Sequence, residues 1–318
     1  MELMPTLLQP IEQPLYDLPF IEANTVPVSL QDICNNHIIP VFTKDNETLI
    51  SQHQFIETAY NEIDTIIKDP LIGPFIRVSH PVKGRIPSAI HKKSEDLLPH
   101  EETLYYERMM FVYIVPNMTR VTNGQLMHMV IGGVKAYNKD NLNKKNGALQ
   151  HFTFFMGFQV KVCSNLCVWS DGVNLQIKVG SKEALGFEIR SILESYNPEE
   201  QLAQYDQWQN LYLKEVQFAH ILGKCRMFQH LKTNQRDGKI SPGISDSQLN
   251  IVAKNYFQDT SFSAQNGKID LWSFYNLFTD ALKSSYIDNM IDHNVHVGKF
   301  VSHVGKSIMM KEPTWYLP

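Results

Sequence analysis

The chain is poor in cysteine and has no long apolar run. Its four cysteines, in a chain of 318 residues, are too few for the disulfide framework that is typical of small secreted domains. No stretch of about 18 apolar residues occurs, so no membrane-spanning helix is predicted. The N-terminal twenty residues lack a basic region and are interrupted by prolines, which is not the pattern of a secretory signal. We therefore expect a cytoplasmic protein that does not enter a membrane.

The sequence also lacks the short motifs of common enzymes and cofactor sites. Gly132 and Gly133 do not have the spacing of a dinucleotide-binding loop, and indicate instead a bulge or a close approach within a strand. Gly305-Lys306-Ser307 lacks the earlier glycine of a phosphate-binding loop. No nucleophile elbow, no zinc-protease helix and no second cysteine pair for zinc is present. No catalytic residue and no cofactor is therefore predicted.

Acidic residues outnumber basic ones, and the two parts of the chain differ in charge. The whole sequence carries a net charge of −4, where a non-specific DNA-binding protein is more often basic. Residues 1–200 contain 17 basic and 23 acidic residues, whereas residues 201–318 contain 12 basic and 10 acidic residues. The C-terminal part therefore leaves room for a local basic surface.

The chain is expected to form one α+β domain behind a proline-rich arm. Prolines recur through residues 1–30, which are predicted to be a flexible arm because proline interrupts helices and central strands. Residues 31–318 are predicted to form a single domain, with a β-rich lobe to about residue 180 and a helical lobe from about residue 199. Strand patterns predict a mostly antiparallel sheet over about 70–180, packed by C-terminal helices over about 199–300.

The longest strand pattern begins at residue 152 and alternates between large apolar and mixed side chains. One face is predicted to enter the core, and it starts with Phe152, Phe154 and Met156. The other face is predicted to point outward or into a groove, and it contains Thr153, Phe155, Gly157, Gln159, Lys161 and Cys163. The strand is either purely structural, or Gln159 and Lys161 line a ligand groove beside Gly157.

The helix predicted from Leu271 to about residue 296 has the most unusual face in the sequence. Aromatic, amide, hydroxyl and ammonium groups recur on it at helical spacing, namely at Trp272, Asn276, Thr279, Lys283, Tyr286, Met290 and His293. Such groups stack on bases and meet phosphates where they are exposed. The alternative is a core-facing helix whose polar side chains pair internally.

Four residues of the same segment invite a metal-binding interpretation: Asp288, Asp292, His293 and His296. The two histidines are three residues apart and share a helical face. Carboxylates and imidazoles near a helix end are also typical of solvated or capping groups. We keep these four residues as weak metal candidates and predict no bound metal.

Four strings occur in an order and spacing typical of one family: GGVKAYNKDNL (132–142), FTFFMGFQVKVCSNLCVWSDG (152–172), QFAHILGKCRMFQ (217–229) and DLWSFYNLFTDALKSSYID (270–288). Over about residues 100–290 the chain resembles the domain-of-unknown-function family 3871 of gut Bacteroidetes-type bacteria. A looser likeness to the phage/plasmid-like family 932 involves Tyr137-Asn138-Lys139, Val162-Cys163-Ser164-Asn165 and the pair Asn276 and Thr279. The resemblance implies a protein of phages, plasmids or integrated elements, and it supplies no activity.

These observations favour a non-enzymatic nucleic-acid-binding or recombination accessory protein of a mobile genetic element. In this hypothesis single- or double-stranded DNA is the partner, and the protein forms homo-oligomers. The binding residues are predicted to be Lys135, Lys161 and Lys283 for phosphates, Tyr137, Trp272 and Tyr286 for stacking, and Asn276 on the same helix face. Two alternatives stay open: a metal-dependent hydrolase of nucleic acid that uses the four metal candidates, and a protein-interaction module, such as a host-defence antagonist, that uses the proline-rich arm.

Overall fold

The structure is a computed structural model, and it describes residues 20–23, 25–36, 49–89, 91–140, 149–161, 163–169 and 175–317. Over these residues it has nine α-helices and eleven β-strands. With 46% helix and 27% strand, the predicted α+β class is confirmed. None of the helices in these ranges combines the length and the apolar character needed to cross a membrane.

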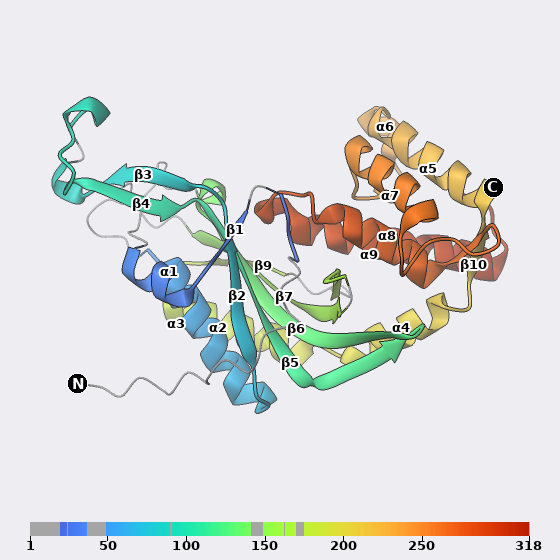
Figure 1. Ribbon diagram of the computed structural model, residues 1–318, viewed down its shortest axis with the longest axis horizontal. Coiled ribbons are helices and arrows are strands. Elements are labelled where there is room, and N and C mark those ends of the chain that lie inside the picture. The colour runs from blue at the N-terminus through green and yellow to red at the C-terminus, as the bar shows by residue number, and fades with distance from the viewer. Residues whose placement is uncertain are drawn as a thin grey trace.

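An antiparallel sheet of seven strands forms the centre of the molecule (Figure 1). Its strands are paired in the order β1–β2–β5–β6–β7–β8, and β9 pairs with β7 on the same side as β8. The strands span Val26–Val28 (β1), Ile72–Val78 (β2), Arg108–Thr122 (β5), Gln125–Ala136 (β6), Gln150–Val160 (β7), Leu166–Trp169 (β8) and Gln176–Val179 (β9). Strands β2 to β9 therefore lie within the region predicted to form the sheet.

Helices cover both faces of this sheet. Helices α2 (Gln52–Ile67) and α3 (Lys182–Ser195) lie on one face, and α9 (Ile287–Met310) packs against β5, β6 and β8 on the other (Figure 1). The second face of β7 is therefore buried, whereas the sequence predicted it to point outward or into a groove. Thr153, Phe155 and Gln159 all lie in the interior. The difference arises because the C-terminal helices fold back over this face.

Gly133 allows α2 to approach the sheet closely. A Cβ atom at this position would lie 2.4 Å from Cζ of Phe55 on α2 and 2.7 Å from Cε1 of Phe111 on β5. The ring centroids of Phe55 and Phe111 are 5.2 Å apart, and the rings meet edge to face. The pairing of β5 with β6 passes through Gly132 and Gly133 without a shift of register. Of the two alternatives for this glycine pair, the structure shows the close approach.

The N-terminal segment is part of the fold from residue 20 onward. Phe20 and Ile21 are buried in the core, and the backbone N–H of Glu22 donates to the carbonyl of Lys283 with an N–O distance of 2.9 Å. Strand β1 pairs with β2, and α1 (Leu30–Asn36) follows it. Burial of the two apolar side chains fixes this segment, so a flexible arm does not extend to residue 30 as predicted. The rest of the predicted arm, residues 1–19, lies outside the described residues.

Strands β3 (Pro81–Arg85) and β4 (Glu102–Tyr106) form a separate two-stranded sheet that projects from the body of the molecule (Figure 1). They lie within the region predicted to form the sheet, over about 70–180, but they do not join the seven-stranded sheet.

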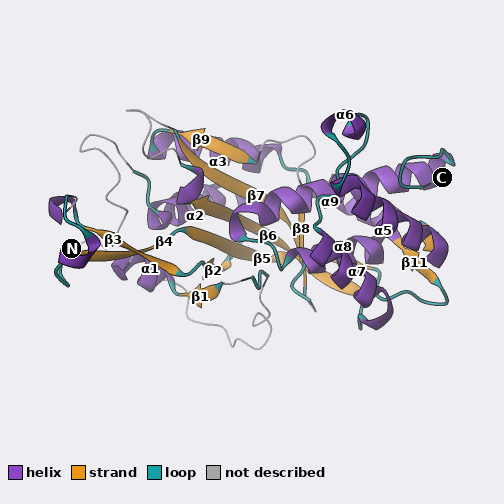
Figure 2. Cartoon of the chain, turned by 90° about the horizontal axis from the view of Figure 1, so that it is seen from above, coloured by secondary structure: helices purple, strands orange, loops and turns teal. Residues whose placement is uncertain are grey.

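The C-terminal part is helical, and Figure 2 shows its helices beside the sheet. Its elements are α4 (Pro198–Trp208), β10 (Tyr212–Lys214), α5 (Glu215–Gln229), α6 (Thr233–Arg236), α7 (Asp246–Gln258), β11 (Lys268–Asp270), α8 (Leu271–Leu282) and α9. The helix predicted over about 271–296 is in fact two helices, because α8 ends at Leu282 and α9 starts at Ile287. In the turn between them, the Ser284 hydroxyl donates to the carbonyl of Ala281 at 2.7 Å. Such a bond from a side chain to the backbone competes with the backbone bonds that would continue the helix.

Two helix–strand–helix units, α4–β10–α5 and α7–β11–α8, pack together in this part. Strand β10 pairs with β11 in antiparallel fashion, with Leu213 opposite Ile269. The first residue of each following helix donates to the other unit: Glu215 N–H to the carbonyl of Gly267 at 3.0 Å, and Leu271 N–H to that of Leu211 at 2.8 Å. The paired strands and the helices that follow them are therefore related by an approximate two-fold axis, although the sequence shows no evident repeat.

Strand β8 ends the sheet next to α9. The side chain of Asn294 on α9 accepts from the backbone N–H of Val168 at 3.1 Å and donates to the carbonyl of Leu166 at 2.7 Å. Asn294 is fully buried, and it also accepts from the Tyr275 hydroxyl at 3.3 Å. One side-chain amide therefore satisfies the backbone groups that a further strand would otherwise bind.

Candidate nucleic-acid interface

The predicted stacking face on α8 lies inside the core. Trp272 is 0% exposed, and its ring centroid lies 4.7 Å from that of Tyr205 on α4. Asn276 is equally buried: its Nδ2 donates to the carbonyl of Trp272 at 3.0 Å, and its own carbonyl accepts from Nδ2 of Asn165 at 3.1 Å. The prediction that Trp272 and Asn276 contact nucleic acid is therefore wrong, and the core-facing alternative for α8 is confirmed.

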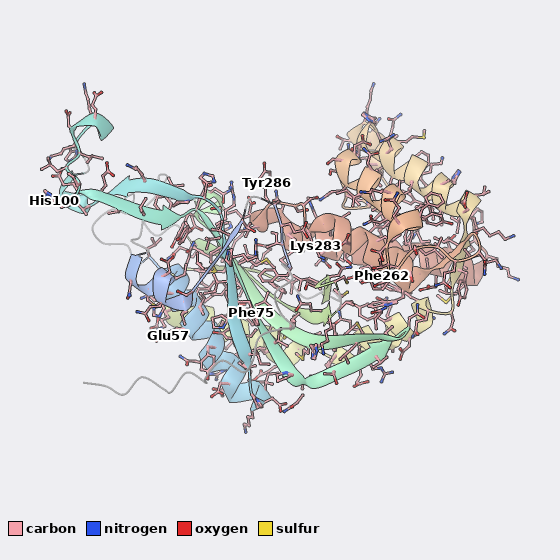
Figure 3. All side chains as sticks on the ribbon, in the orientation of Figure 1. Glu57, Phe75, His100, Phe262, Lys283 and Tyr286 are labelled. Atoms are coloured by element: carbon pink, nitrogen blue, oxygen red, sulfur yellow. The ribbon has the colours of Figure 1, made fainter. Side chains whose placement is uncertain are left out.

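Lys283 and Tyr286 lie in the turn between α8 and α9, and they differ in exposure. The ammonium group of Lys283 is buried, bonded to the carbonyl of Cys163 and, at 3.0 Å, to Oδ1 of Asp280. Tyr286 is 58% exposed, and the guanidinium carbon of Arg108 lies 5.8 Å from its ring centroid. Figure 3 shows both side chains near the junction of the sheet with the helices. Lys283 is therefore not free to meet a phosphate, and Tyr286 is the exposed aromatic residue of the predicted set.

Lys135 and Tyr137 are also in the interior. The side chains of Lys135 and Asp140 are 0% and 1% exposed, and Nζ lies 2.6 Å from Oδ2. Nζ also lies 4.0 Å from the ring centroid of Phe152. Burial lowers the pKa of Lys135 to about 8, although Asp140 acts in the opposite direction. Burial raises the pKa of Tyr137 above its ordinary value. The prediction that these residues contact phosphates and bases is wrong, because this ammonium already has a buried carboxylate partner.

Lys161 follows β7 at the far end of the sheet from Lys135. Its backbone N–H donates to the carbonyl of Leu126 at 2.9 Å, near the start of β6. Since Leu126 and Lys135 lie nine residues apart on that strand, the two lysines are separated by about 30 Å. Lys161 is half-buried, and its charge contributes to a lowered pKa of His128 after the larger effect of burial. The predicted residues therefore do not form one surface.

The four metal candidates are used for contacts within the protein. Asp288 pairs with Arg108, with 3.3 Å between Oδ1 and Nε, and Asp292 accepts from Gln176 at 2.8 Å. Nδ1 of His293 lies 3.4 Å from the Ser285 hydroxyl, and Nδ1 of His296 lies 2.7 Å from the carbonyl of Asp292. Within the described ranges, no group of three or more His, Cys, Asp or Glu residues is arranged to hold a metal ion. The four residues therefore no longer support the alternative of a metal-dependent hydrolase.

A surface that the sequence did not single out carries positive charge that is unpaired among the described residues. Residues 220–239 contain five basic residues and one acidic residue, and they form α5, α6 and the turn beyond. Arg226 is paired with Asp246 at 2.5 Å. The ion pairs found among the described residues include none of the other four, Lys224, Lys232, Arg236 and Lys239. We call these four residues the basic face.

Aromatic side chains lie beneath the basic face. Nζ of Lys224 is 3.6 Å and Nζ of Lys239 is 5.6 Å from the ring centroid of Trp315. The guanidinium carbon of Arg236 lies 5.3 Å from the ring centroid of Phe228. Tyr316 links the two rings, with its centroid 6.4 Å from that of Trp315 and 6.5 Å from that of Phe228. The C-terminal segment thus joins α5 and α6 in one cationic and aromatic surface.

A charge count over a short window could have found the basic face. The excess over residues 220–239 is clear once the window is narrowed to these two helices, whereas a count over residues 201–318 dilutes it. Trp315 could not have been assigned in this way. It lies more than 70 residues further along the chain, and only the fold brings it to Lys224.

The comparisons with known proteins identify a family and no activity. The family model described as "Domain of unknown function, B. Theta Gene description (DUF3871)" matches residues 5–317, nearly the whole chain. No curated protein and no solved structure matches the chain. The chain belongs to this family, as its sequence strings suggested.

Proposed function

We propose that this member of the DUF3871 family is a non-enzymatic, cytoplasmic nucleic-acid-binding protein, an accessory to recombination in a mobile genetic element. It binds DNA through the basic face on α5 and α6. The link to phages, plasmids or integrated elements rests on the sequence resemblance alone.

The observation that carries this proposal is a set of cations, in an acidic protein, that have no carboxylate partner among the residues that the structure describes. Lys232 and Arg236 are exposed, and Lys224 and Lys239 are half-buried. Arg236 is held in place, since its Nε and Nη2 donate to the carbonyls of Leu231 and Gln229, both at 3.0 Å. A guanidinium fixed in this way has other N–H groups left for phosphate oxygens. Phosphate contacts of this kind supply most of the affinity in non-specific binding of nucleic acid.

The protein-interaction alternative has less support. It depends on apolar residues of the proline-rich arm, and two of these, Phe20 and Ile21, are buried in this protein's own core. The remaining residues of the arm, 1–19, lie outside the described residues.

Fluorescence anisotropy with labelled single- and double-stranded oligonucleotides over a range of salt concentrations tests the proposal. If all four cations contact phosphates, the logarithm of the binding constant should fall with the logarithm of salt concentration with a slope of about −3 for a single strand. In the double variant Lys232→Gln and Arg236→Gln, the slope should become shallower by about 1.4 and binding should weaken, because two contacts are lost.

The matched control is the double variant Lys178→Gln and Lys254→Gln. It changes the net charge by the same amount at exposed lysines on β9 and α7. This control should bind as the wild type does. An equal loss in both double variants, or no binding by the wild type at low salt and tens of micromolar protein, would overturn the proposal.

A further inference from the structure

Two ammonium groups of the basic face converge on one ring. Since Lys224 and Lys239 lie 3.6 Å and 5.6 Å from the centroid of Trp315, their Nζ atoms are at most 9.2 Å apart, the sum of these distances. Neither lysine forms an ion pair with a carboxylate of the described residues. Two like charges held this close repel each other, and the electron-rich face of the indole offsets this repulsion only in part.

Hydrogen bonds of Lys239 and Tyr316 hold the ammonium groups and the Trp315 ring in place. Nζ of Lys239 donates to the carbonyl of Gln235 at 2.7 Å, which leaves two of its three N–H groups for another acceptor. Next to Lys239, the carbonyl of Ile240 accepts from the Tyr316 hydroxyl at 2.5 Å, and this bond fixes the C-terminal segment against the α6 turn. The ring and the two ammonium groups are therefore positioned before any ligand binds, which reduces the entropic cost of binding.

We propose that Lys224 and Lys239 bind one phosphate group of a single-stranded nucleic acid, and that the neighbouring base stacks on Trp315. We call this the phosphate seat. A phosphate oxygen placed between the two ammonium groups supplies a negative charge that the described part of the chain does not provide there. Trp315 is half-buried, so part of its ring faces solvent. A base can reach such a ring when it is unpaired, whereas the bases of a duplex are stacked on each other.

The phosphate seat rests on the proposed function, but it makes a separate claim about which residues select a single strand. The two half-buried lysines and Trp315 act on single strands. The exposed Lys232 and Arg236 contribute to binding of both single strands and duplex, because they meet backbone phosphates only.

Binding of oligothymidylate, measured by anisotropy and by tryptophan emission, tests this inference. In the double variant Lys224→Gln and Lys239→Gln, the salt slope for the single strand should become shallower by about 1.4, and the preference for single strand over duplex should fall. In the variant Trp315→Phe, the wild-type emission change on binding should be lost. Trp208 and Trp272 are buried, so they should report no contact with a base. Trp315→Phe retains an aromatic ring and serves as the variant that preserves packing.

The outcomes separate the two proposals. No binding by the wild type contradicts the proposed function itself. If Lys232→Gln with Arg236→Gln weakens binding while Lys224→Gln with Lys239→Gln does not, the basic face stands and the phosphate seat is wrong. An unchanged preference for single strands in the lysine double variant, or an emission change that persists in Trp315→Phe, also overturns the seat. Strands with and without a 5′-phosphate then identify the ligand: equal affinity indicates an internal phosphodiester, and tighter binding of the phosphorylated strand indicates the terminal phosphate.

Discussion

Helices α5 and α8 occupy equivalent places in the two helix–strand–helix units, yet one carries a solvent-exposed charged face and the other is buried. Phe218 and Phe274 stand at matching positions, four residues after the last residue of β10 and of β11. Every residue of α8 except Asp280 is buried, whereas α5 exposes residues along its length. The local pattern is similar, and the difference comes from location: α8 lies in the middle of the helical part, and α5 lies at its edge (Figure 1).

The comparison shows why the polar character of α8 was misleading. Its amide and hydroxyl groups are satisfied by the protein, as when the Thr279 hydroxyl donates to the carbonyl of Asn276 at 3.1 Å. The four cations of the basic face, in contrast, have no carboxylate partner among the described residues. An exposed binding surface is therefore better identified by charges that the protein leaves unpaired than by polar residues at helical spacing.

The sharpest test of the comparison replaces the residues at two matching positions, one on each helix, by alanine. Trp272 on α8 corresponds to Val216 on α5, and their exposures are 0% and 80%. Trp272→Ala should lower the free energy of unfolding by about 3–5 kcal/mol, because it leaves a large cavity. Val216→Ala should change it by less than about 0.5 kcal/mol. Urea denaturation measures both, and a small loss for Trp272→Ala would show that α8 is not a core helix.

Replacement of a buried lysine and of an exposed lysine should also have different effects on stability. Lys135→Ala removes the partner of the buried Asp140 carboxylate and should cost about 3 kcal/mol, whereas Lys232→Ala on the exposed α6 cap should cost less than about 0.5 kcal/mol. In the double variant Lys135→Met and Asp140→Leu, most of the stability should return, because no charge is then left buried. Thermal and urea unfolding test this, and a double variant as unstable as Lys135→Ala would contradict the ion-pair explanation.

The stability of the buried pair should depend on pH in a defined direction. The pKa of Lys135 is about 8 in the folded state, below the ordinary value near 10.4. Between these values the unfolded state binds more protons, so stability rises with pH, by at most about 1.4 kcal/mol per pH unit. The difference in unfolding free energy between the wild type and the Lys135→Met, Asp140→Leu variant should therefore grow in favour of the wild type from pH 8 to 10. A flat difference would show that the lysine does not titrate in this range.

Substitution of Tyr286 should have the smallest effect on stability and on DNA binding. It is exposed at the start of α9 and belongs neither to the core nor to the basic face. Tyr286→Ala should change the free energy of unfolding by less than about 0.5 kcal/mol and leave DNA affinity unchanged. A clear loss of DNA binding in anisotropy would show that the interface extends to the junction between sheet and helices.

Local signals in the sequence predicted much of the fold. Ser51 and Ser245, each followed three residues later by a glutamine, begin α2 and α7 with a capping box, which is a signal readable in the sequence. The predicted binding face on α8 is wrong because the burial of its residues depends on residues distant in sequence. Asn165 provides the partner of Asn276, and Tyr205 covers Trp272, so neither burial can be seen from the pattern around residue 272. The sequence pattern does not reveal the break between α8 and α9 at Ser284 and Ser285, because polar and aromatic residues keep their helical spacing across it. The pattern therefore places Lys283 and Tyr286 on a single helix face.

The amide of Asn294 has a consequence for how this protein behaves at high concentration. Strand edges with free backbone groups are the places where neighbouring molecules add strands and start fibres. At Leu166 and Val168 that edge is already occupied by a side chain from the same molecule. Replacement of Asn294 by leucine would leave these two buried backbone groups unpaired, which weakens the packing of α9 that keeps the edge from other molecules.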